Sequence, residues 1–379
     1  MNRKKILKII NIPIIFIAVA GLTIILINQS CSSAKYSTGD KQVNKIEQSA
    51  QYRDGKFRNY DDWEQPSIGE FASTMWDFLF GGDQRTPNDS IPRQQVDLNH
   101  FYRKGNNQLN VTWLGHSSLM INIDGYKILT DPVFEKKVSL VGPSRYNGDV
   151  PLNINQITEV DVILISHNHY DHLNKFSIQS LNSKTKKFIV PLAVGAQLEE
   201  WGVSADKIVE LDWWEELRVD ENLTIIATPA QHFSGRGLTD RDETLWASFV
   251  IKGLFHKIFY SGDSGYFDGF KQIGEVYGPF DLTFIETGAY NEKWHFIHMF
   301  PEETVQAHID LQGKILHPIH WATFNLSLHS WFEPMERLTD AADSLKVKTA
   351  IPVVGETTVF NEYIPSVKWW ELIIANKMN

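Results

Sequence analysis

Residues 160–174 read VDVILISHNHYDHLN, and this stretch decides how the rest of the chain is interpreted. Its first half is a run of apolar, mostly β-branched residues, which is typical of a strand buried on both faces. The run ends abruptly in four side chains that can bind metal: His167, His169, Asp171 and His172. Neutral imidazoles and carboxylates suit zinc and similar divalent ions, and a rigid strand end can hold them in place. The stretch therefore predicts a metal site at the carboxyl end of a buried strand.

Three further candidate ligands follow apolar strands later in the chain. His232 comes after LTIIATPAQ, Asp263 lies in a glycine-flanked turn after KIFY, and His320 comes after KILHPI. Strand ends on one edge of a layered α/β fold converge on a single cleft. Seven ligands are too many for one tetrahedral zinc, and two ions held close together need a shared anionic group. We therefore expect two metal ions, with Asp263 between them.

The first thirty residues differ from everything that follows. Four basic residues precede a nearly unbroken apolar run over residues 9–27. Such a segment is either a membrane-spanning anchor or an export signal, and its charge distribution places the carboxyl side outside the cytoplasm. Cys31, the only cysteine, lies where a bacterial lipoprotein would carry its lipid-modified residue. We expect residues 1–31 to tether the catalytic domain to a membrane, through a retained helix or a lipid on Cys31.

The composition of the whole chain is that of a globular protein. Of the 379 residues, 42% are hydrophobic and 22% are charged, and the net charge is −10. A net negative charge argues against nucleic acid as a partner. Residues 32–58 are polar and poor in aromatic side chains, which predicts a solvated linker. Residues 59–379 are expected to form one catalytic domain that begins with a helical extension.

This extension is predicted from SIGEFASTMWDFLFGG, in which apolar residues recur at helical spacing from Ile68 to Leu79. Ser67 is a suitable cap, and Gly81 is expected to end the helix. Two interpretations stay open: a helix packed on the domain, or a surface that enters the membrane near the active site. Packing is favoured, because Trp and Phe side chains such as Trp76 are usually buried in globular proteins.

Two residues are candidates for a supporting role around the metals. NVTWLGHSSLMINI and YKILT are predicted as two strands around Gly125, and His116 in the first of them either lies near the metals or caps a strand end. Asp131 follows the second strand, where it either terminates a turn or supports a metal-bound histidine.

Other side chains are candidates for contact with substrate. One lies within the metal motif, one follows His232 where a guanidinium could clamp a phosphate, and two lie in or next to a loop expected to border the cleft. For each of them, packing or exposure to solvent is the alternative. These candidates are Tyr170, Arg236, Tyr290 and His298.

Whole motifs also resemble the metallo-β-lactamase fold superfamily, and within it the N-acyl-phosphatidylethanolamine-hydrolysing phospholipase D family and its bacterial homologues. The resemblance implies an α/β fold, a four-layer αββα sandwich. The motifs that carry it span the catalytic domain: WEQPSI at 63–68, TDPVF at 130–134, GPSRY at 142–146, SHNHYDHL at 166–173, GPFDL at 278–282, GAY at 288–290, PEE at 301–303 and IHWATF at 319–324.

The resemblance divides the candidate ligands into two zinc sites that share one carboxylate. Iron or manganese would also fit these ligands, because imidazole and carboxylate groups bind all three metals. The carboxylates at the catalytic centre are then Asp171 and Asp263. The division is His167, His169 and His232 for one ion, Asp171, His172 and His320 for the other, and Asp263 between them.

The function implied by the resemblance is hydrolysis of a phosphodiester in phospholipids of the N-acyl-phosphatidylethanolamine type, with a metal-bridging hydroxide as the nucleophile. No serine or cysteine nucleophile is needed, and the chain has no GxSxG motif. Around residues 284–287 and 291–299 the chain departs from the animal phospholipases. Two alternatives therefore stay open: a zinc-dependent lactonase acting on a small ester, and a membrane-anchored binding protein without catalytic activity. The oligomeric state is also open, and a homodimer is compatible with the sequence.

Overall fold

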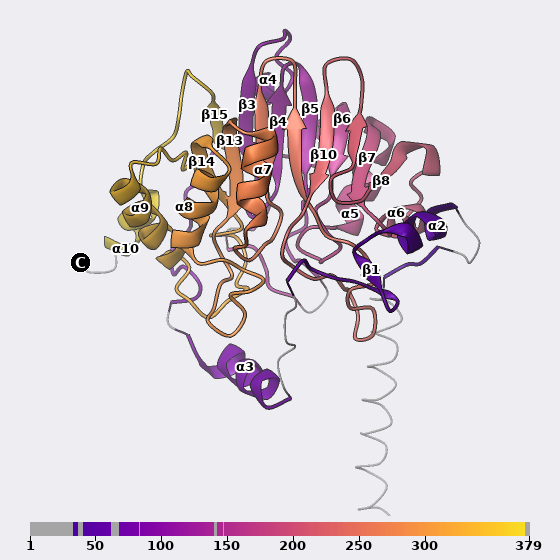
Figure 1. The fold of residues 1–379 in the computed structure, drawn as a ribbon. Coiled ribbons are helices and arrows are strands. Elements are labelled where there is room, and N and C mark those ends of the chain that lie inside the picture. The colour runs from indigo at the N-terminus through magenta and orange to yellow at the C-terminus, as the bar shows by residue number, and fades with distance from the viewer. Residues whose placement is uncertain are drawn as a thin grey trace, which may run out of the picture.

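The computed structural model describes residues 33–36, 41–61, 68–82, 84–139, 142–146 and 148–375. Two mixed β-sheets lie face to face at the centre of the molecule, and helices cover their outer faces (Figure 1). Packing of two sheets between helical layers is the αββα arrangement that the sequence motifs predicted. The prediction of the fold is therefore confirmed for the described residues.

The larger sheet contains seven strands in the order β15-β3-β4-β5-β6-β7-β8. Strands β15, β3, β4 and β5 pair antiparallel, whereas β5, β6, β7 and β8 pair parallel. The parallel part places the carboxyl end of β6, where the metal motif starts, at one edge of the sheet. The strands are β3 (Leu109–Trp113), β4 (Leu119–Ile123), β5 (Tyr126–Thr130), β6 (Val160–Leu164), β7 (Thr185–Pro191), β8 (Ile208–Leu211) and β15 (Thr357–Val359).

The second sheet contains six strands in the order β14-β13-β12-β11-β10-β9. Strands β12, β13 and β14 pair parallel, so the residues that follow them emerge at a common edge. The other pairs are antiparallel. The strands are β9 (Glu216–Arg218), β10 (Thr224–Thr228), β11 (Ser248–Lys252), β12 (Lys257–Tyr260), β13 (Phe280–Glu286) and β14 (Gly313–Ile319).

The longer helices follow the strands as crossover connections. In the sequence, PEETVQAHIDLQG predicts the helix α8, whose first residue is Pro301, a position where proline is favoured. The helices of the domain are α4 (Leu98–Phe101), α5 (Lys175–Leu181), α6 (Gly195–Glu200), α7 (Gly269–Tyr277), α8 (Pro301–Asp310), α9 (Glu333–Leu345) and α10 (Trp369–Ala375), with short 3₁₀ turns at Ile154–Gln156, Asn182–Lys184 and Ala205–Lys207.

Strand β6 illustrates how the layers are held together. Val162 and Leu164 are fully buried in the core that contains residues of both sheets. Ile163 points the other way and packs in a second core with Ile178 of α5. Successive side chains of a strand face opposite sides, and here both sides are buried. This is why β6 is apolar from Val162 to Leu164.

The strand predicted over residues 110–123 is divided in two. A turn at residues 114–118 separates β3 from β4, and His116 within it has a φ of 55°. A residue with positive φ cannot continue a strand, so the chain reverses here. The prediction of one continuous strand was wrong, and the turn brings His116 to the edge of the sheet that carries the metal motif.

The described residues between 33 and 57 pack on the domain and do not form the predicted solvated linker. They include α2 (Lys41–Gln48), β1 (Tyr52–Arg53) and β2 (Lys56–Phe57). Ile46 and Phe57 are buried in the central core, and the Phe57 N–H donates to the carbonyl of Asp242 at 2.8 Å. Two well-placed apolar side chains are therefore enough to dock a segment whose average composition is polar.

Helix α3 (Ile68–Phe80) is present as predicted and ends directly before Gly81. Its Phe78 ring stacks on Trp294 with centroids 6.0 Å apart. The packing prediction was wrong for Trp76, which is 64% exposed next to Phe80, itself 69% exposed. One side of α3 therefore contacts the domain and another presents two aromatic rings to solvent.

No helix among the residues described here is long and apolar enough to span a bilayer. The predicted anchor or signal over residues 1–31, with the candidate lipidation position Cys31, lies outside these residues.

Candidate metal centre

The metal motif forms a tight loop between β6 and α5. The backbone N–H groups of His172 and Leu173 both donate to the carbonyl of His169, at 3.1 and 2.8 Å. Asn174 then caps α5, because its side chain accepts from the Ser177 N–H at 2.9 Å. A buried strand at one end and a capped helix at the other fix the loop. Its four candidate ligands are thereby held at the edge of the sheet.

The first group of ligands consists of three imidazoles. Nδ1 of His169 lies 2.8 Å from Nε2 of His167 and 3.3 Å from Nε2 of His232. The far nitrogens are held from behind: Nδ1 of His167 lies 2.9 Å from Ser166 Oγ, and Nδ1 of His232 donates to the carbonyl of Ile297 at 3.0 Å. Burial lowers the pKa of His167 and of His232 well below the usual value, so both rings are neutral. Neutral imidazoles are the form that binds metal.

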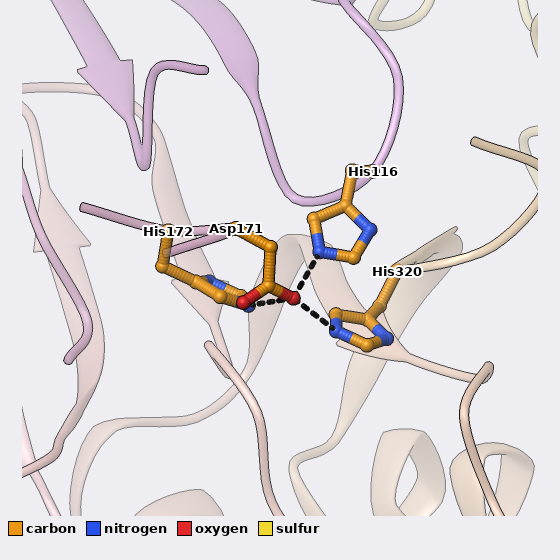
Figure 2. A group of neighbouring side chains, drawn as sticks. All are labelled: His116, Asp171, His172 and His320. Atoms are coloured by element: carbon orange, nitrogen blue, oxygen red, sulfur yellow. Dashed lines mark hydrogen bonds and ion pairs between the residues drawn. The ribbon is translucent and has the colours of Figure 1, made fainter. Parts of the chain in front are cut away.

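Asp171 lies at the centre of the second group (Figure 2). Its Oδ2 is 2.9 Å from Nε2 of His116, 3.5 Å from Nε2 of His172 and 3.6 Å from Nε2 of His320. The three rings come from different parts of the chain: the β3–β4 turn, the metal motif and the segment after β14. His116 is thus brought to the metal centre, where it contacts a carboxylate of the motif. Burial lowers the pKa of His116 to about 3.

Asp263 lies between the two groups. Its Oδ2 is 3.1 Å from Nε2 of both His172 and His320, and it is 3.9 and 3.8 Å from Nε2 of His167 and His232. Asp263 follows β12 in a turn that begins with Gly262, whose φ is 58°. A Cβ on Gly262 would lie 2.5 Å from the Cβ of Ser166, so only glycine lets this turn approach the metal motif closely.

Several buried polar atoms of this cluster have no hydrogen-bond partner in the described chain. They are Nε2 of His172, both ring nitrogens of His320 and Oδ1 of Asp263. Leaving such a group unpaired costs about 1–3 kcal/mol, so buried atoms of this kind call for another partner. Burial opposes ionisation of Asp263, but His172 and His320 outweigh it and hold the pKa of Asp263 well below its usual range. An ionised carboxylate among unpaired ring nitrogens fits divalent metal ions.

Sequence comparison agrees with this geometry. The family described as "Beta-lactamase superfamily domain" matches residues 126–321, a span that contains all seven ligands predicted from the sequence. The chain belongs to the metallo-β-lactamase fold superfamily. It is therefore a hydrolase fold with a site for divalent metal.

Three relatives place the chain within this superfamily. An uncharacterised protein of Mycobacterium tuberculosis is 42% identical over 335 residues, which are 86% of this chain and 88% of the relative. N-acyl-phosphatidylethanolamine-hydrolyzing phospholipase D 1 of Caenorhabditis elegans is 32% identical over 294 residues, 72% of this chain and 82% of that protein. Among solved structures, the metallo hydrolase Igni18 of Ignicoccus hospitalis matches with a TM-score of 0.52 and 21% identity, covering 68% of this chain and all of that one.

Asp131 contacts the metal motif from behind. This agrees with one of the two interpretations of the sequence, in which Asp131 supports a metal-binding histidine. It is fully buried, and its Oδ2 lies 2.6 Å from Nδ1 of His172. Its carboxylate also accepts from the Ser166 N–H at 2.7 Å and from the Tyr260 hydroxyl at 2.6 Å. A carboxylate behind a metal-binding histidine fixes the ring orientation and increases its basicity. Sequence reasoning missed Tyr260, whose hydroxyl ends an otherwise apolar strand.

Glu286 is a second buried carboxylate beside the ligands, and sequence reasoning did not select it. It ends β13 and is fully buried, with Oε2 2.7 Å from Nδ1 of His298. The His298 ring lies 5.1 Å from the ring of His232 and 5.3 Å from that of His320, so this substrate candidate does border the centre. The available signal was a carboxylate directly after Phe284 and Ile285, at the end of a strand predicted to be buried.

Tyr170 and Arg236 pack on each other at the rim of the motif. The Arg236 guanidinium lies 3.9 Å above the Tyr170 ring. Its Nη1 donates to the carbonyls of Asn168 and Leu173, at 2.6 and 3.0 Å. Arg236 was a candidate phosphate clamp, but these contacts brace the loop that carries the ligands. Its direct role in the structure is to position that loop.

Tyr290, the remaining substrate candidate, packs against His329 and α9. Its ring stacks on His329 with centroids 4.3 Å apart, and its hydroxyl donates to Glu333 of α9 at 2.8 Å. Only 3% of the residue is exposed. These contacts favour the packing alternative, in which Tyr290 joins the loop after β13 to α9.

Proposed function

We propose that this chain is a dinuclear metal-dependent phosphodiesterase of the phospholipase D type that hydrolyses lipids like N-acyl-phosphatidylethanolamine. The observation that carries the proposal is the arrangement of six candidate ligands in two groups around a seventh, Asp263, whose Oδ2 lies within 3.9 Å of ring nitrogens of both groups. Such an arrangement suits in-line displacement at phosphorus, where two ions act on the attacking and leaving oxygens. The name of the C. elegans relative supports the lipid substrate.

The residues of the chain have separable tasks in this reaction. Divalent ions bound here would lower the pKa of a bound water to near neutrality and would stabilise the charge that develops on the phosphate oxygens. Asp263 offsets the repulsion between the two ions. Asp171 contributes the negative charge of the second ligand group. Asp131 fixes the orientation of the His172 ring, and Arg236 fixes the loop that carries the metal motif. His298, at the border of both groups, is placed to contact the phosphate or the leaving group. Zinc suits the ligand set, and iron or manganese fits it as well.

The position of Ser33 beside the metal motif supports access of the site to a membrane lipid. Ser33 is buried beside the motif: its N–H and Oγ–H donate to Asp240 at 2.6 and 2.7 Å, and Asn168 donates to its Oγ at 2.7 Å. The apolar run over residues 9–27 ends six positions before Ser33, a reach of about 20 Å at full extension. A tether in that run would therefore hold the metal centre close to the bilayer, with the catalytic domain outside the cytoplasm.

Helix α3 adds a second contact at the same edge. Lys293, in the loop that carries His298, forms a salt bridge with Asp77 of α3, with Nζ and Oδ2 2.6 Å apart. The exposed rings of Trp76 and Phe80 lie 4.5 Å apart on this helix. Aromatic rings on an amphipathic helix insert at the boundary between headgroups and acyl chains. Both features support access of the site to membrane lipid.

Replacing Trp76 and Phe80 together by serine is expected to lower turnover of lipid in vesicles by more than about tenfold, since full burial of one such ring contributes roughly 1.5–3 kcal/mol and about 1.4 kcal/mol is a factor of ten. Turnover of a water-soluble nitrophenyl phosphodiester should stay unchanged. Phe255→Ser is the matched control: Phe255 is 55% exposed in the turn before β12, at the opposite end of that strand from Asp263. If the double variant turned over both the lipid and the nitrophenyl ester at the wild-type rate, α3 would not contact the membrane.

The substrate is tested with the full-length, metal-loaded chain in mixed micelles containing N-acyl-phosphatidylethanolamine, beside a panel of lactones. The expected products are phosphatidic acid and N-acylethanolamine, and their release should stop when a chelator removes the ions and resume when zinc is restored. Opening of a lactone without lipid cleavage would instead assign a lactonase with the same metal centre. Lipid binding without turnover of either substrate would assign a binding protein.

A further inference from the structure

Asn59 connects the segment before α3 to the loop that carries the candidate ligand His232. Its Nδ2 donates to the His232 carbonyl at 2.8 Å, and its Oδ1 accepts from the His232 N–H at 3.1 Å. The same Oδ1 accepts from Nε1 of Trp246 at 2.9 Å. Among the described residues, Asn59 is the only hydrogen-bond partner of the His232 backbone. One side chain therefore satisfies both backbone groups of a candidate metal ligand.

Ser33 makes a similar contact with the other loop of the first ligand group. It is buried, and its Oγ accepts from Nδ2 of Asn168, a residue inside the metal motif, at 2.7 Å. Oδ1 of Asn168 accepts in turn from the N–H of Gly235 at 2.8 Å, three residues after His232. Asn168 thus joins Ser33, the metal motif and the His232 loop in one line of hydrogen bonds.

The second ligand group is supported by the domain itself. The His320 N–H donates to the carbonyl of His116 at 3.2 Å, and Oδ2 of Asp131 lies 2.6 Å from Nδ1 of His172. The hydrogen bonds that Asn59 and Ser33 make within the described chain all go to other residues. These two side chains therefore support one ligand group and not the other.

We propose that the described residues between 33 and 61, which we call the amino-terminal arm, form part of the first metal site. Asn59 is a positioning residue that fixes the backbone of His232. Nδ1 of His232 is held by the Ile297 carbonyl at 3.0 Å, so a fixed backbone also fixes the direction in which Nε2 binds an ion. Ser33 has the same role for the motif loop. The inference rests on the two-ion site of the proposed function and is independent of its substrate.

Docking of the arm and binding of the first ion are linked by this arrangement. If contacts made only by the docked arm favour a bound ion, the bound ion favours docking by the same factor. The arm follows residues 1–31, which the sequence predicts to tether the chain to a membrane. Binding of the first ion should therefore hold the arm, which continues from this tether, against the domain.

Asn59→Leu in the full-length chain, kept in detergent micelles, tests the inference through zinc binding. Leucine has the branched shape of asparagine but makes no hydrogen bond and leaves little room for water. Each site is measured alone: His320→Ala leaves only the first group complete, and His169→Ala leaves only the second. Competition with a chelator should show that Asn59→Leu weakens zinc binding about 10–100-fold at the first group. At the second group, zinc affinity should stay within about threefold of its value without Asn59→Leu.

Tyr60→Phe is the matched control. Tyr60 is the next residue of the arm, and its hydroxyl accepts from Nε1 of Trp214, outside both ligand groups, at 2.6 Å. This variant also loses one hydrogen bond between arm and domain, but it should keep wild-type zinc affinity at both groups. Ser33→Ala, which keeps the contact of Asn168 with Gly235, should weaken zinc binding at the first group alone, by about three- to tenfold.

Hydrogen exchange of the metal-free chain separates a positioned ligand from a general loss of stability. In Asn59→Leu, peptides that contain His232 should exchange faster than in the wild type, whereas peptides that contain His172 should not. In the wild type, zinc should slow exchange of arm peptides around Phe57, and this protection should be smaller in Asn59→Leu. The exchange measurement needs neither histidine variant, so it decides the role of Asn59 even if those variants do not fold.

Three results would overturn the inference: unchanged zinc affinity at the first group of Asn59→Leu, an equal loss at both groups, or equal exchange of His232 peptides in variant and wild type. A wild-type chain that binds no zinc at the first group would overturn the two-ion site of the proposed function together with the inference. Two bound ions without cleavage of any phosphodiester would instead reject only the proposed substrate.

Discussion

Replacing Asp263 by asparagine is expected to lower kcat more than about 1,000-fold and to leave the purified chain with fewer than two bound ions. Asp263 lies between both ligand groups: its Oδ2 is 3.1 Å from Nε2 of His172 and of His320, and 3.9 and 3.8 Å from Nε2 of His167 and His232. Asparagine has the same shape but no charge, so it cannot offset the repulsion between two divalent ions. Loss of a single stabilising donor in an active site already costs about 10²–10³ in rate, and a shared ligand acts on both ions. Metal analysis and steady-state kinetics on the same sample measure both effects.

Asp268→Asn is the matched control for this prediction. Asp268 lies five positions further along the same loop and is exposed. Its change should leave the metal content and kcat at wild-type values. A fully active Asp263→Asn protein with two ions would contradict the shared-ligand role and the dinuclear proposal with it.

Asp131→Asn is expected to destabilise the fold by about 3–5 kcal/mol and to weaken metal binding at the second group about 10–100-fold. The fully buried carboxylate accepts from the Ser166 backbone and side chain, from Tyr260 and from His172. The amide of asparagine would direct two N–H groups at some of these donors. Breaking a buried charged network in this way costs about 3–5 kcal/mol of stability. His172 would also lose the group that orients its ring. Denaturant unfolding of the metal-free chain and zinc titration measure the two effects separately.

Tyr260→Phe provides the comparison. It removes one hydroxyl donor but keeps the Asp131 carboxylate and its contact with His172. The expected loss is about 1 kcal/mol, with zinc affinity close to wild type. An Asp131→Asn protein as stable as Tyr260→Phe would show that the carboxylate's charge is not required beneath the motif.

Local sequence was sufficient to predict that the candidate ligands come together, because these residues directly follow strands in the chain. A β-branched apolar run marks β6, and the four motif side chains follow within eight residues of its end. His232, Asp263 and His320 likewise follow strands β10, β12 and β14. Parallel strands in a layered fold end at a common edge, so residue order alone was enough to expect these side chains to converge.

Local sequence was insufficient where a contact joins distant segments. Glu286 reads as part of an apolar strand, and only its 2.7 Å contact with His298 indicates a role. Ser33 lies in a polar segment that predicts a linker, yet its partners Asn168 and Asp240 are 135 and 207 residues away. Trp76 was expected to be buried because tryptophan usually is, but the side of α3 that meets the domain is set by Phe78 and Asp77.

The sequence by itself thus determined the superfamily, through its resemblance to known motifs, and a set of candidate ligands for divalent metal that follow apolar strands, because these features depend on residue type and short-range patterns. The tertiary structure alone decided which carboxylate stands behind which histidine, that Arg236 braces the motif loop, and that residues before β1 lie beside the metal centre. These features depend on side-chain directions and on packing between segments far apart in the chain, where a shift of about 1 Å separates a hydrogen bond from no contact.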